Sequence, residues 1–168
     1  MKIRPSVDNI RRLPLRLAPG LFLINSGVGK LGLDEESAAG LQAMAGNAIP
    51  QVHLLSPAVF GKTLAAGEIA LGTALLTPMV RTGVAGAGLT AFSAGLLRMY
   101  ARTPGMHENL RPTQDGTAIA KDSWLLGIGL SLIVDALAGR GRKDKEDARG
   151  DDGGPGDEQG QESAAEQS

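Results

Sequence analysis

The sequence predicts an all-α protein built as a four-helix membrane bundle, with a short interfacial helix between the first two spans and a disordered C-terminal tail. Four apolar segments occupy most of residues 15–138, and three of them reach the 17–25 residues with which a helix crosses a bilayer. The charges are also segregated. Residues 1–16 hold five basic residues against one acidic residue, whereas residues 139–168 hold five basic and nine acidic residues. The long middle of the chain therefore has the composition of a membrane domain rather than of a soluble surface.

Four segments are predicted to span the bilayer: residues 15–33, 58–80, 83–101 and 123–138. Together they define a membrane domain at 15–138, which follows a basic segment at 1–14 and precedes a charged tail at 139–168. The fourth segment is short and requires either the preceding residues 118–121 or local thinning of the bilayer. A soluble Gly/Ala-rich helical domain is the alternative, because no segment reaches 18 uncharged residues. Four such segments would leave no polar face, however, and a soluble helix needs one.

The distribution of Lys and Arg predicts the orientation of the spans. The basic N-terminal segment, Arg81 and the basic residues at 140–145 all fall on one side of a four-span bundle, whereas the acidic residues 34–36 fall on the other. Loops rich in Lys and Arg remain in the cytoplasm. We therefore expect a multi-pass protein of the bacterial cytoplasmic membrane with both termini in the cytoplasm.

The loop between the first two spans is predicted to contain the short interfacial helix. Asp34 has the position of an N-cap, acidic residues follow it in the first turn, and Pro50 ends the pattern. Four apolar residues recur with helical spacing on one face: Leu41, Met44, Ala45 and Ala48. Such a helix suits the outer membrane surface. The tail, in contrast, is rich in Gly, Asp, Glu and Gln without periodicity, which predicts disorder.

Composition and motifs exclude several classes of function. The chain has no cysteine, which excludes disulfides and thiolate metal sites, and its net charge of −1 gives no reason to expect nucleic acid. His53 and His107 have no third metal ligand nearby, so we expect no metal. The stretch around Lys30 resembles a phosphate-binding loop but lacks its first glycine and the Ser or Thr after the lysine. The stretch ending in Thr63 has serine where the first glycine belongs.

Ionisable residues within the spans are the candidate functional site. Glu68 lies about midway along the second span, where a charge costs several kcal/mol unless it is paired or faces the bundle interior. Lys30 lies near the outer end of the first span, Asn25 lies deeper in it, and Arg98 lies about 22 Å along the third. Lys30, Glu68 and Arg98 are predicted to form one polar cluster with a total charge of +1. Two interpretations remain open: a site that binds a quinone head group or an anion, or relays protons, and an ion pair that fixes helix register.

The third span carries a stripe of small residues at intervals of four: Gly83, Ala87, Ala91 and Gly95. Small residues at this spacing allow two helix backbones to approach closely. The stripe is predicted to pack inside the bundle, and a seam in a homo-oligomer is the alternative.

Two residues near the ends of the last span also have predicted roles. Trp124 begins this span, where aromatic residues commonly anchor at the interface. Asp135 lies three residues from its cytoplasmic end and is predicted to be solvated, or paired with Arg140 or Arg81.

Several stretches of the sequence resemble the DoxX-like membrane proteins. The opening "RLAPGLFLINSGVGKLG" carries Arg16, Gly20, Phe22, Gly27 and Lys30 at the positions of that pattern. "GEIALGTALL" looks like the second helix of the family, and "KDSWLL" is similar to the entry of its fourth. The resemblance covers roughly residues 13–140 and rests on loose glycine and charge patterns.

The resemblance implies a four-helix integral membrane protein associated with membrane redox systems, including quinone-linked sulfur oxidation and oxidative-stress assemblies. It carries over no catalytic residue. The leading hypothesis is a subunit of a membrane redox complex, with a quinone as a noncovalent cofactor and soluble oxidoreductases as partners. The alternatives are a small proton- or solute-coupled transporter and a non-catalytic membrane scaffold for soluble partners. The sequence does not decide whether the chain is an enzyme.

Overall fold

The computed structural model describes residues 7–108, 111–114 and 122–151, and these residues are almost entirely helical. The long helices are α1 (Val7–Leu31), α3 (Pro57–Leu76), α4 (Thr82–Arg102) and α6 (Ser123–Asp151). The shorter elements are α2 (Glu35–Gly46), a 3₁₀ turn η1 (Pro50–Leu54), and the antiparallel strands β1 (His107–Glu108) and β2 (Arg111–Pro112). The prediction of an all-α protein is confirmed, apart from this two-stranded hairpin.

Two of the helices, α2 and α3, begin where a side chain accepts hydrogen bonds from free backbone N–H groups. The Asp34 side chain accepts a hydrogen bond from the Ser37 backbone N–H, which confirms the predicted N-cap of α2. Ser56 plays the same role for α3, with Pro57 in the first turn, where a missing N–H costs nothing. That α3 ends at Leu76 is consistent with the Pro78 that follows.

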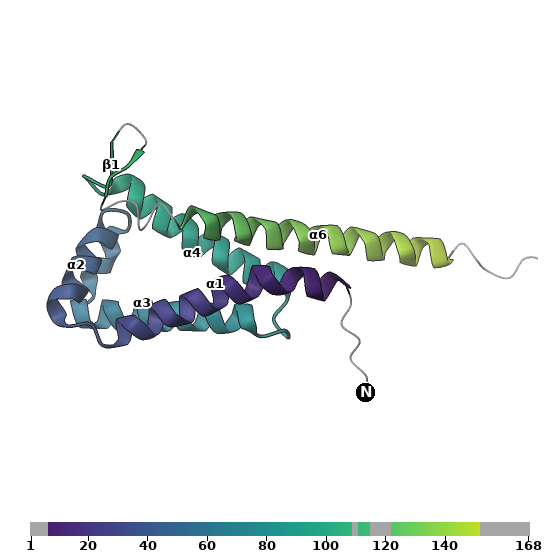
Figure 1. Cartoon of the computed structure of the whole chain (residues 1–168), viewed down its shortest axis with the longest axis horizontal. Helices are drawn as coiled ribbons and strands as arrows, with labels where there is room; N and C mark the ends of the chain where they lie inside the picture. Colours follow the sequence, from purple (N-terminus) through teal and green to yellow (C-terminus); the bar gives the residue numbers. More distant parts are fainter. Residues whose placement is uncertain (1–6, 109–110, 115–121, 152–168) are drawn as a thin grey trace, which may run out of the picture.

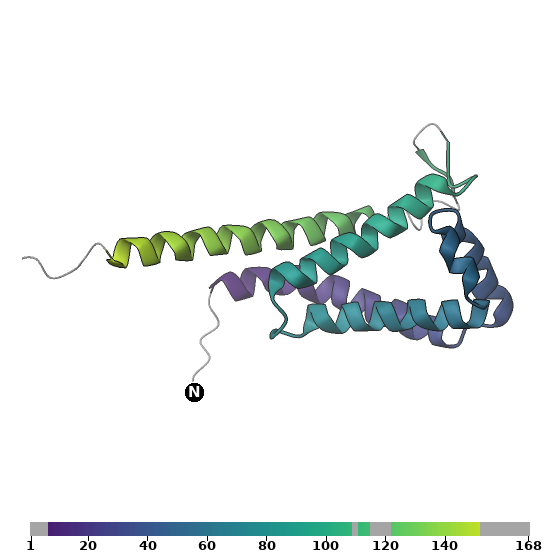
Figure 2. The same cartoon turned by 180° about the vertical axis from the view of Figure 1, so that it is seen from behind.

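The long helices pack as two antiparallel pairs, α1 with α3 and α4 with α6. Contacts within each pair are far more extensive than contacts between the pairs. The two pairs come together near the N-terminal half of α1 and separate toward α2, which lies across the opposite end (Figure 1). Seen from behind, α4 and α6 again lie on one side and α1 and α3 on the other (Figure 2).

The apolar core lies where the two pairs meet and draws on all four long helices. Its fully buried leucines are Leu23 of α1, Leu75 of α3, Leu89 of α4, and Leu125 and Leu132 of α6. One cluster therefore holds the two pairs together.

Small residues bring α1 and α3 into close contact. A Cβ atom added at Gly72 would lie 2.7 Å from the carbonyl oxygen of Gly20, and one at Gly27 would lie 2.7 Å from that of Ala65. Each pair of partners is one heptad from the next along an antiparallel crossing, so the same geometry is used twice. This close approach sets the register of α1 on α3.

Helices α4 and α6 also approach closely at glycines, but on a different face of α4 from the one predicted. A Cβ atom at Gly86 would lie 2.9 Å from the Gly129 carbonyl oxygen. The predicted stripe contributes little, because Ala87 and Ala91 are exposed.

Gly95, the last member of the stripe, has open space around it, whereas Gly83 at its beginning does approach Ala136. The prediction that the whole stripe packs inside the bundle is therefore wrong: the contact face is turned by one residue, to the side that carries Gly86. A seam between copies of the chain stays a prediction.

The observed helices differ from the predicted spans mainly at the ends of the chain. Helix α1 begins at Val7 within the predicted basic segment and runs through Pro14 and Pro19. Helix α6 continues to Asp151, so the prediction of disorder is wrong for residues 139–151. Lys and Arg, which make up five of these 13 residues, are good helix formers. The rest of the predicted tail lies outside the described residues.

Two of the long helices, Pro57–Leu76 and Ser123–Gly141 within α6, are long and apolar enough to cross a membrane. The chain is thus a helical protein with two candidate membrane spans.

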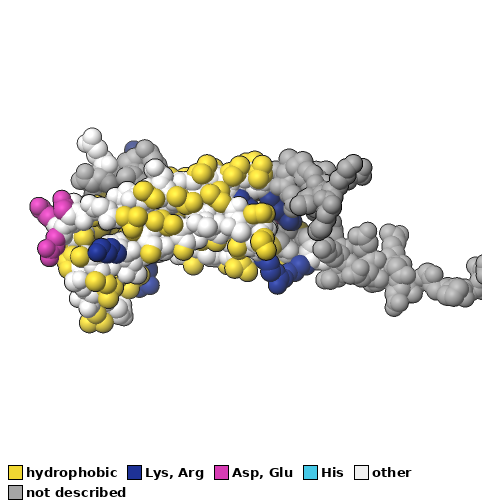
Figure 3. Space-filling view, turned by 90° about the horizontal axis from the view of Figure 1, so that it is seen from below, with side chains coloured by type: hydrophobic (Ala, Val, Ile, Leu, Met, Phe, Trp, Pro, Cys, Tyr) yellow, Lys and Arg dark blue, Asp and Glu magenta, His cyan; other side chains and the backbone are white. Residues whose placement is uncertain are grey.

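The exterior of the bundle is apolar over much of its length. Large exposed hydrophobic side chains follow α1 and α6 in particular: Leu13, Leu17, Leu21, Phe22, Val28 and Leu31, and Trp124, Leu130, Val134 and Leu137. In Figure 3 hydrophobic side chains extend along the face, acidic side chains gather at one end, and a patch of Lys and Arg lies near the other.

Candidate functional site: a buried charge cluster

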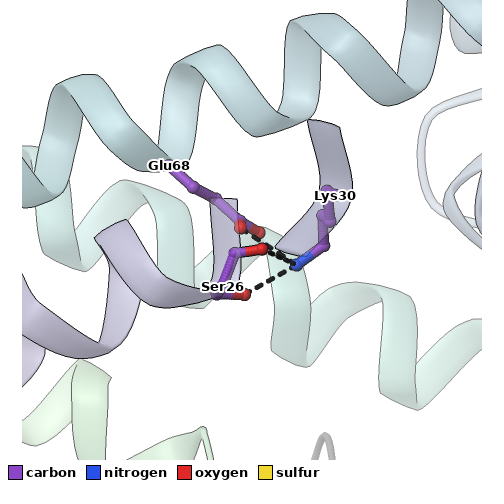
Figure 4. A network of polar contacts seen from close by, with 3 residues as sticks. All are labelled: Ser26, Lys30 and Glu68. Carbon is purple, nitrogen blue, oxygen red and sulfur yellow. Dashed lines mark hydrogen bonds and ion pairs between the residues drawn. The ribbon is translucent and has the colours of Figure 1, made fainter. Parts of the chain in front are cut away.

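Lys30 of α1 and Glu68 of α3 form an ion pair across the first helix pair (Figure 4). The Lys30 Nζ atom lies 2.9 Å from Glu68 Oε2 and donates a second hydrogen bond of 2.6 Å to the Ser26 hydroxyl. Its distance to the Ser26 carbonyl oxygen is 3.4 Å. The predicted proximity of Lys30 and Glu68 is confirmed.

The close approach of the two backbones positions this pair. Gly27 contacts Ala65, and each lies three residues before one member of the pair. With no side chain at Gly27, α1 lies near enough to α3 for the lysine to reach the carboxylate. The Glu68 side chain is only 5% exposed, whereas that of Lys30 is 21% exposed. The Glu68 side chain is therefore enclosed, while the Lys30 side chain remains partly exposed.

Asp122 lies directly before α6. Burial raises the pKa of its carboxyl above the ordinary value, the negative charge of Glu68 raises it further, and the positive charge of Lys30 acts in the opposite direction. In the described part of the chain, Asp122 forms no hydrogen bond or ion pair with either residue. We refer to Ser26, Lys30 and Glu68 as the charge cluster.

An aromatic contact connects the first turn of α6 to α1, about two helical turns before Lys30. The rings of Phe22 and Trp124 meet edge to face with centroids 5.9 Å apart. Both side chains are also partly exposed on the outside of the bundle, Phe22 by 42% and Trp124 by 41%. This pair therefore forms an apolar edge between α1 and α6.

The structure does not bring the other predicted members into the cluster. The Arg98 side chain is exposed on α4, and in the described part of the chain it forms no hydrogen bond or ion pair with Lys30 or Glu68. Asn25 is likewise exposed on α1. The predicted total of +1 is not retained without Arg98, because the charges of Lys30 and Glu68 sum to zero when both are ionised.

The opposite end of the bundle has its own polar contacts, and Arg16 makes most of them. Its guanidinium donates to backbone carbonyls at the end of α3 and in the following turn: Leu75 at 2.7 Å, Thr77 at 2.8 Å, Ala74 at 3.0 Å and Val80 at 3.2 Å. The positive charge also interacts favourably with the negative end of the α3 dipole. Arg16 therefore caps α3 and attaches it to α1.

Arg12 forms an ion pair with Asp135, which joins α1 to α6 at this same end. The prediction that Asp135 is solvated or paired with Arg140 or Arg81 is wrong, because α1 begins earlier than expected and presents Arg12 to it. The contact connects the two helix pairs near the place where they converge.

The charge cluster contains one residue that the sequence alone did not single out. Ser26 lies one turn before Lys30, a spacing that puts both side chains on one face. The spacing was present in the sequence, but it does not specify a contact.

Comparison with protein-family models gives no match, and no curated protein or solved structure matches the chain. The resemblance to DoxX-like proteins therefore stays a prediction, and the inference of function depends on the site itself.

Proposed function

We propose that the chain is a four-span integral membrane protein with both termini in the cytoplasm. Its apolar exterior supports this proposal, because a water-soluble bundle would expose polar side chains where α1 and α6 expose leucine and valine. The location of the charges supports the orientation. Arg12, Arg16 and Arg81 lie toward one end and the acidic residues 34–36 toward the other.

Cysteine labelling tests the orientation, since the chain has no cysteine of its own. A Glu36→Cys variant should react with a membrane-impermeant maleimide in intact cells, and an Arg140→Cys variant only after permeabilisation. The opposite pattern, or labelling of both only after permeabilisation, would contradict the proposed arrangement.

Within this bundle, the charge cluster is proposed to bind the polar head of a small membrane-soluble ligand, of which a quinone is the class that fits best. The Lys30 side chain is 21% exposed beside Glu68. Its ammonium can donate to a quinone oxygen in place of the long 3.4 Å contact with the Ser26 carbonyl oxygen. The exposed Phe22–Trp124 edge offers an apolar surface for the ring. The protein would then serve as a DoxX-like subunit of a membrane redox complex, with soluble oxidoreductases as partners.

A binding experiment tests this function in purified protein. A short-chain quinone should quench the fluorescence of Trp124, the one tryptophan of the chain, with a saturable dependence on concentration. Lys30→Met should weaken this binding at least tenfold, because it removes the donor. Lys62→Met is the matched control: Lys62 is exposed on α3, and its loss should change nothing. Equal binding by the Lys30 and Lys62 variants would refute the role of the cluster.

A proton- or solute-coupled transporter is a second candidate, supported by the packing of the helices in two pairs. The pairs contact each other much less than their members do, so one pair could move against the other. Flux in proteoliposomes that depends on a pH gradient and is lost in Glu68→Gln would favour this candidate. Flux that ignores both would count against it.

A further inference from the structure

We propose that the 3₁₀ turn η1 inserts into the outer leaflet of the bilayer, at the boundary between the lipid headgroups and the acyl chains. The partner of this surface is the lipid itself. The inference rests on the proposed membrane arrangement, which places η1 at the outer end of the bundle, but it requires neither a quinone nor a redox partner. It moves the contact with the membrane surface from α2, where the sequence placed it, to the turn that follows.

The turn presents large apolar side chains to the outside of the protein. Leu54 is 87% exposed, and Ile49 and Leu55 on either side of η1 are exposed as well. Val59 in the first turn of α3 is also exposed. The apolar surface of η1 therefore continues onto the apolar exterior of the bundle, which the proposed arrangement places in lipid.

This end of the molecule also lacks charged side chains over a long stretch. Residues 37–61 contain no Asp, Glu, Lys or Arg, although 21% of the whole chain is charged. The stretch covers most of α2, all of η1 and the first turn of α3, and hydrophobic side chains extend to the end of the molecule that carries the acidic side chains (Figure 3). Contiguous exposed apolar surface of this kind marks a site of contact with a membrane or a protein.

The hydrogen bonds of the turn favour lipid over water as its surroundings. The buried Gln42 side chain donates from Nε2 to the carbonyl oxygens of Val52 and Leu55, each at 2.8 Å. Within the turn, the Val52 N–H donates to the Ile49 carbonyl oxygen and the Leu55 N–H to that of Val52, each at 3.1 Å. Backbone groups at the edge of lipid need such partners, because little water is there to bond them.

Helix α2 serves as the base of the turn. Of the apolar face that was predicted to lie on the membrane, Ala48 is fully buried. Ala38 of α2 packs against Gly61 of α3, where an added Cβ atom would lie 3.4 Å from the alanine Cβ. The His53 ring lies directly over Gly46, so an added Cβ atom there would collide with it. The turn is thus fixed to α2 by contacts at both of its faces, with Leu54 left outside.

The residue types of this stretch favour lipid over a protein partner. Protein interfaces are anchored mainly by Trp, Tyr and Arg, and residues 37–61 contain none of these. Contact with a membrane surface depends instead on the area of the apolar face, which is buried about 5–10 Å into the headgroup and acyl boundary. Leucine, isoleucine and valine side chains are sufficient for such a contact.

Tryptophan fluorescence in bilayers tests the depth of the turn. The full-length chain with Trp124→Phe has no tryptophan, so one reporter is added at a time, as Leu54→Trp, Ala43→Trp or Leu21→Trp. Ala43 is exposed on the same face of α2 as Glu36 and is the matched control for water. Leu21, exposed near the middle of the predicted first span, is the control for the acyl chains.

Each protein is reconstituted into phosphatidylcholine bilayers whose lipids carry bromine either near the headgroup end or near the methyl end of the acyl chain. We expect the shallow bromines to quench the Leu54→Trp emission more than the deep ones do. The same emission should be blue-shifted relative to Ala43→Trp and protected from iodide in the water. Leu21→Trp should be quenched more strongly by the deep bromines.

The role of Gln42 is tested in the Leu54→Trp protein. Gln42→Ala removes both hydrogen bonds to the turn and should reduce the preference for shallow over deep bromines, because the turn no longer has one fixed position. Gln51→Ala is the matched control, since Gln51 is exposed on η1 and should leave the preference unchanged. Equal effects of the two changes would overturn the positioning role of Gln42.

The insertion of η1 is overturned if Leu54→Trp is as accessible to iodide as Ala43→Trp and is quenched by neither lipid. Emission that is shielded from iodide but insensitive to bromine would overturn it as well, and would show that a second copy of the chain covers the turn. The proposed arrangement is tested separately by Leu21→Trp. Quenching at Leu54 without quenching at Leu21 would retain the membrane contact of the turn and refute the span of α1, and the reverse result would retain the span alone.

Discussion

The close contact of α1 with α3 predicts how much one added methyl group changes the stability of the protein. In Gly72→Ala the new Cβ atom would lie 2.7 Å from the Gly20 carbonyl oxygen and 2.8 Å from Ile24 Cγ1. These distances are below normal contact, so α1 and α3 must move apart by several tenths of an ångström. Overpacking of this kind costs about 1–3 kcal/mol, and the better helix propensity of alanine offsets about 1 kcal/mol of it.

Gly67 on the same helix is the matched control, because a Cβ atom there meets nothing within 4 Å. Gly67→Ala should gain about 0.5–1 kcal/mol from helix propensity alone. The two alanine variants should therefore differ by about 1–3 kcal/mol, which corresponds to roughly 2–12 °C in melting temperature for a chain of this size.

The assay is thermal unfolding in one detergent, followed by the helical circular dichroism signal. The same comparison of alanine variants is repeated on two other helices, with Gly27 and Gly29 on α1 and with Gly129 and Gly127 on α6. In each pair a Cβ atom at the first glycine is crowded by the neighbouring helix, and one at the second meets nothing within 4 Å. Gly27→Ala should also separate Lys30 from its partner and weaken ligand binding. Equal melting temperatures within all three pairs would show that these contacts do not hold the helices together.

Three further predictions concern charged side chains. Lys30→Met should destabilise the protein by about 3–5 kcal/mol in thermal unfolding, because it leaves a buried carboxylate unpaired, whereas Lys30→Met combined with Glu68→Met should recover most of the loss; a double variant less stable than the single one would refute this. Arg16→Lys should accelerate amide hydrogen exchange at the end of α3, since a lysine cannot donate to four carbonyls at once; unchanged exchange there would contradict the capping role. Hydrogen bonds from Ser37 lower the pKa of Asp34, so its stabilisation of α2 is present above the ordinary Asp value and is lost as the pH falls through the lower folded pKa; Asp34→Asn, which caps without titrating, should remove this pH dependence from exchange at Ser37.

How much of the site was predictable from sequence differs from residue to residue. A glutamate amid apolar residues needs a partner, and Lys30 on the antiparallel neighbour was the nearest candidate, so their meeting could be predicted from cost and depth alone. Arg98 was placed in the cluster by its depth, but depth does not say which way a side chain points around its helix. Its exposure follows from α4 turning Gly86 toward α6.

The amino-acid sequence by itself determined the helical class, the four long helices, the cap at Asp34 and the separation of charge between the two ends. These features depend on local spacing and on the solvent that each side chain requires. The tertiary structure decided the pairing of α1 with α3 and of α4 with α6, the face on which each pair closes, and the ion pair of Arg12 with Asp135. Several faces of a glycine- and alanine-rich helix are nearly equivalent when read along the chain. Only the simultaneous packing of all four helices chooses among them, and that choice determines which charges become neighbours.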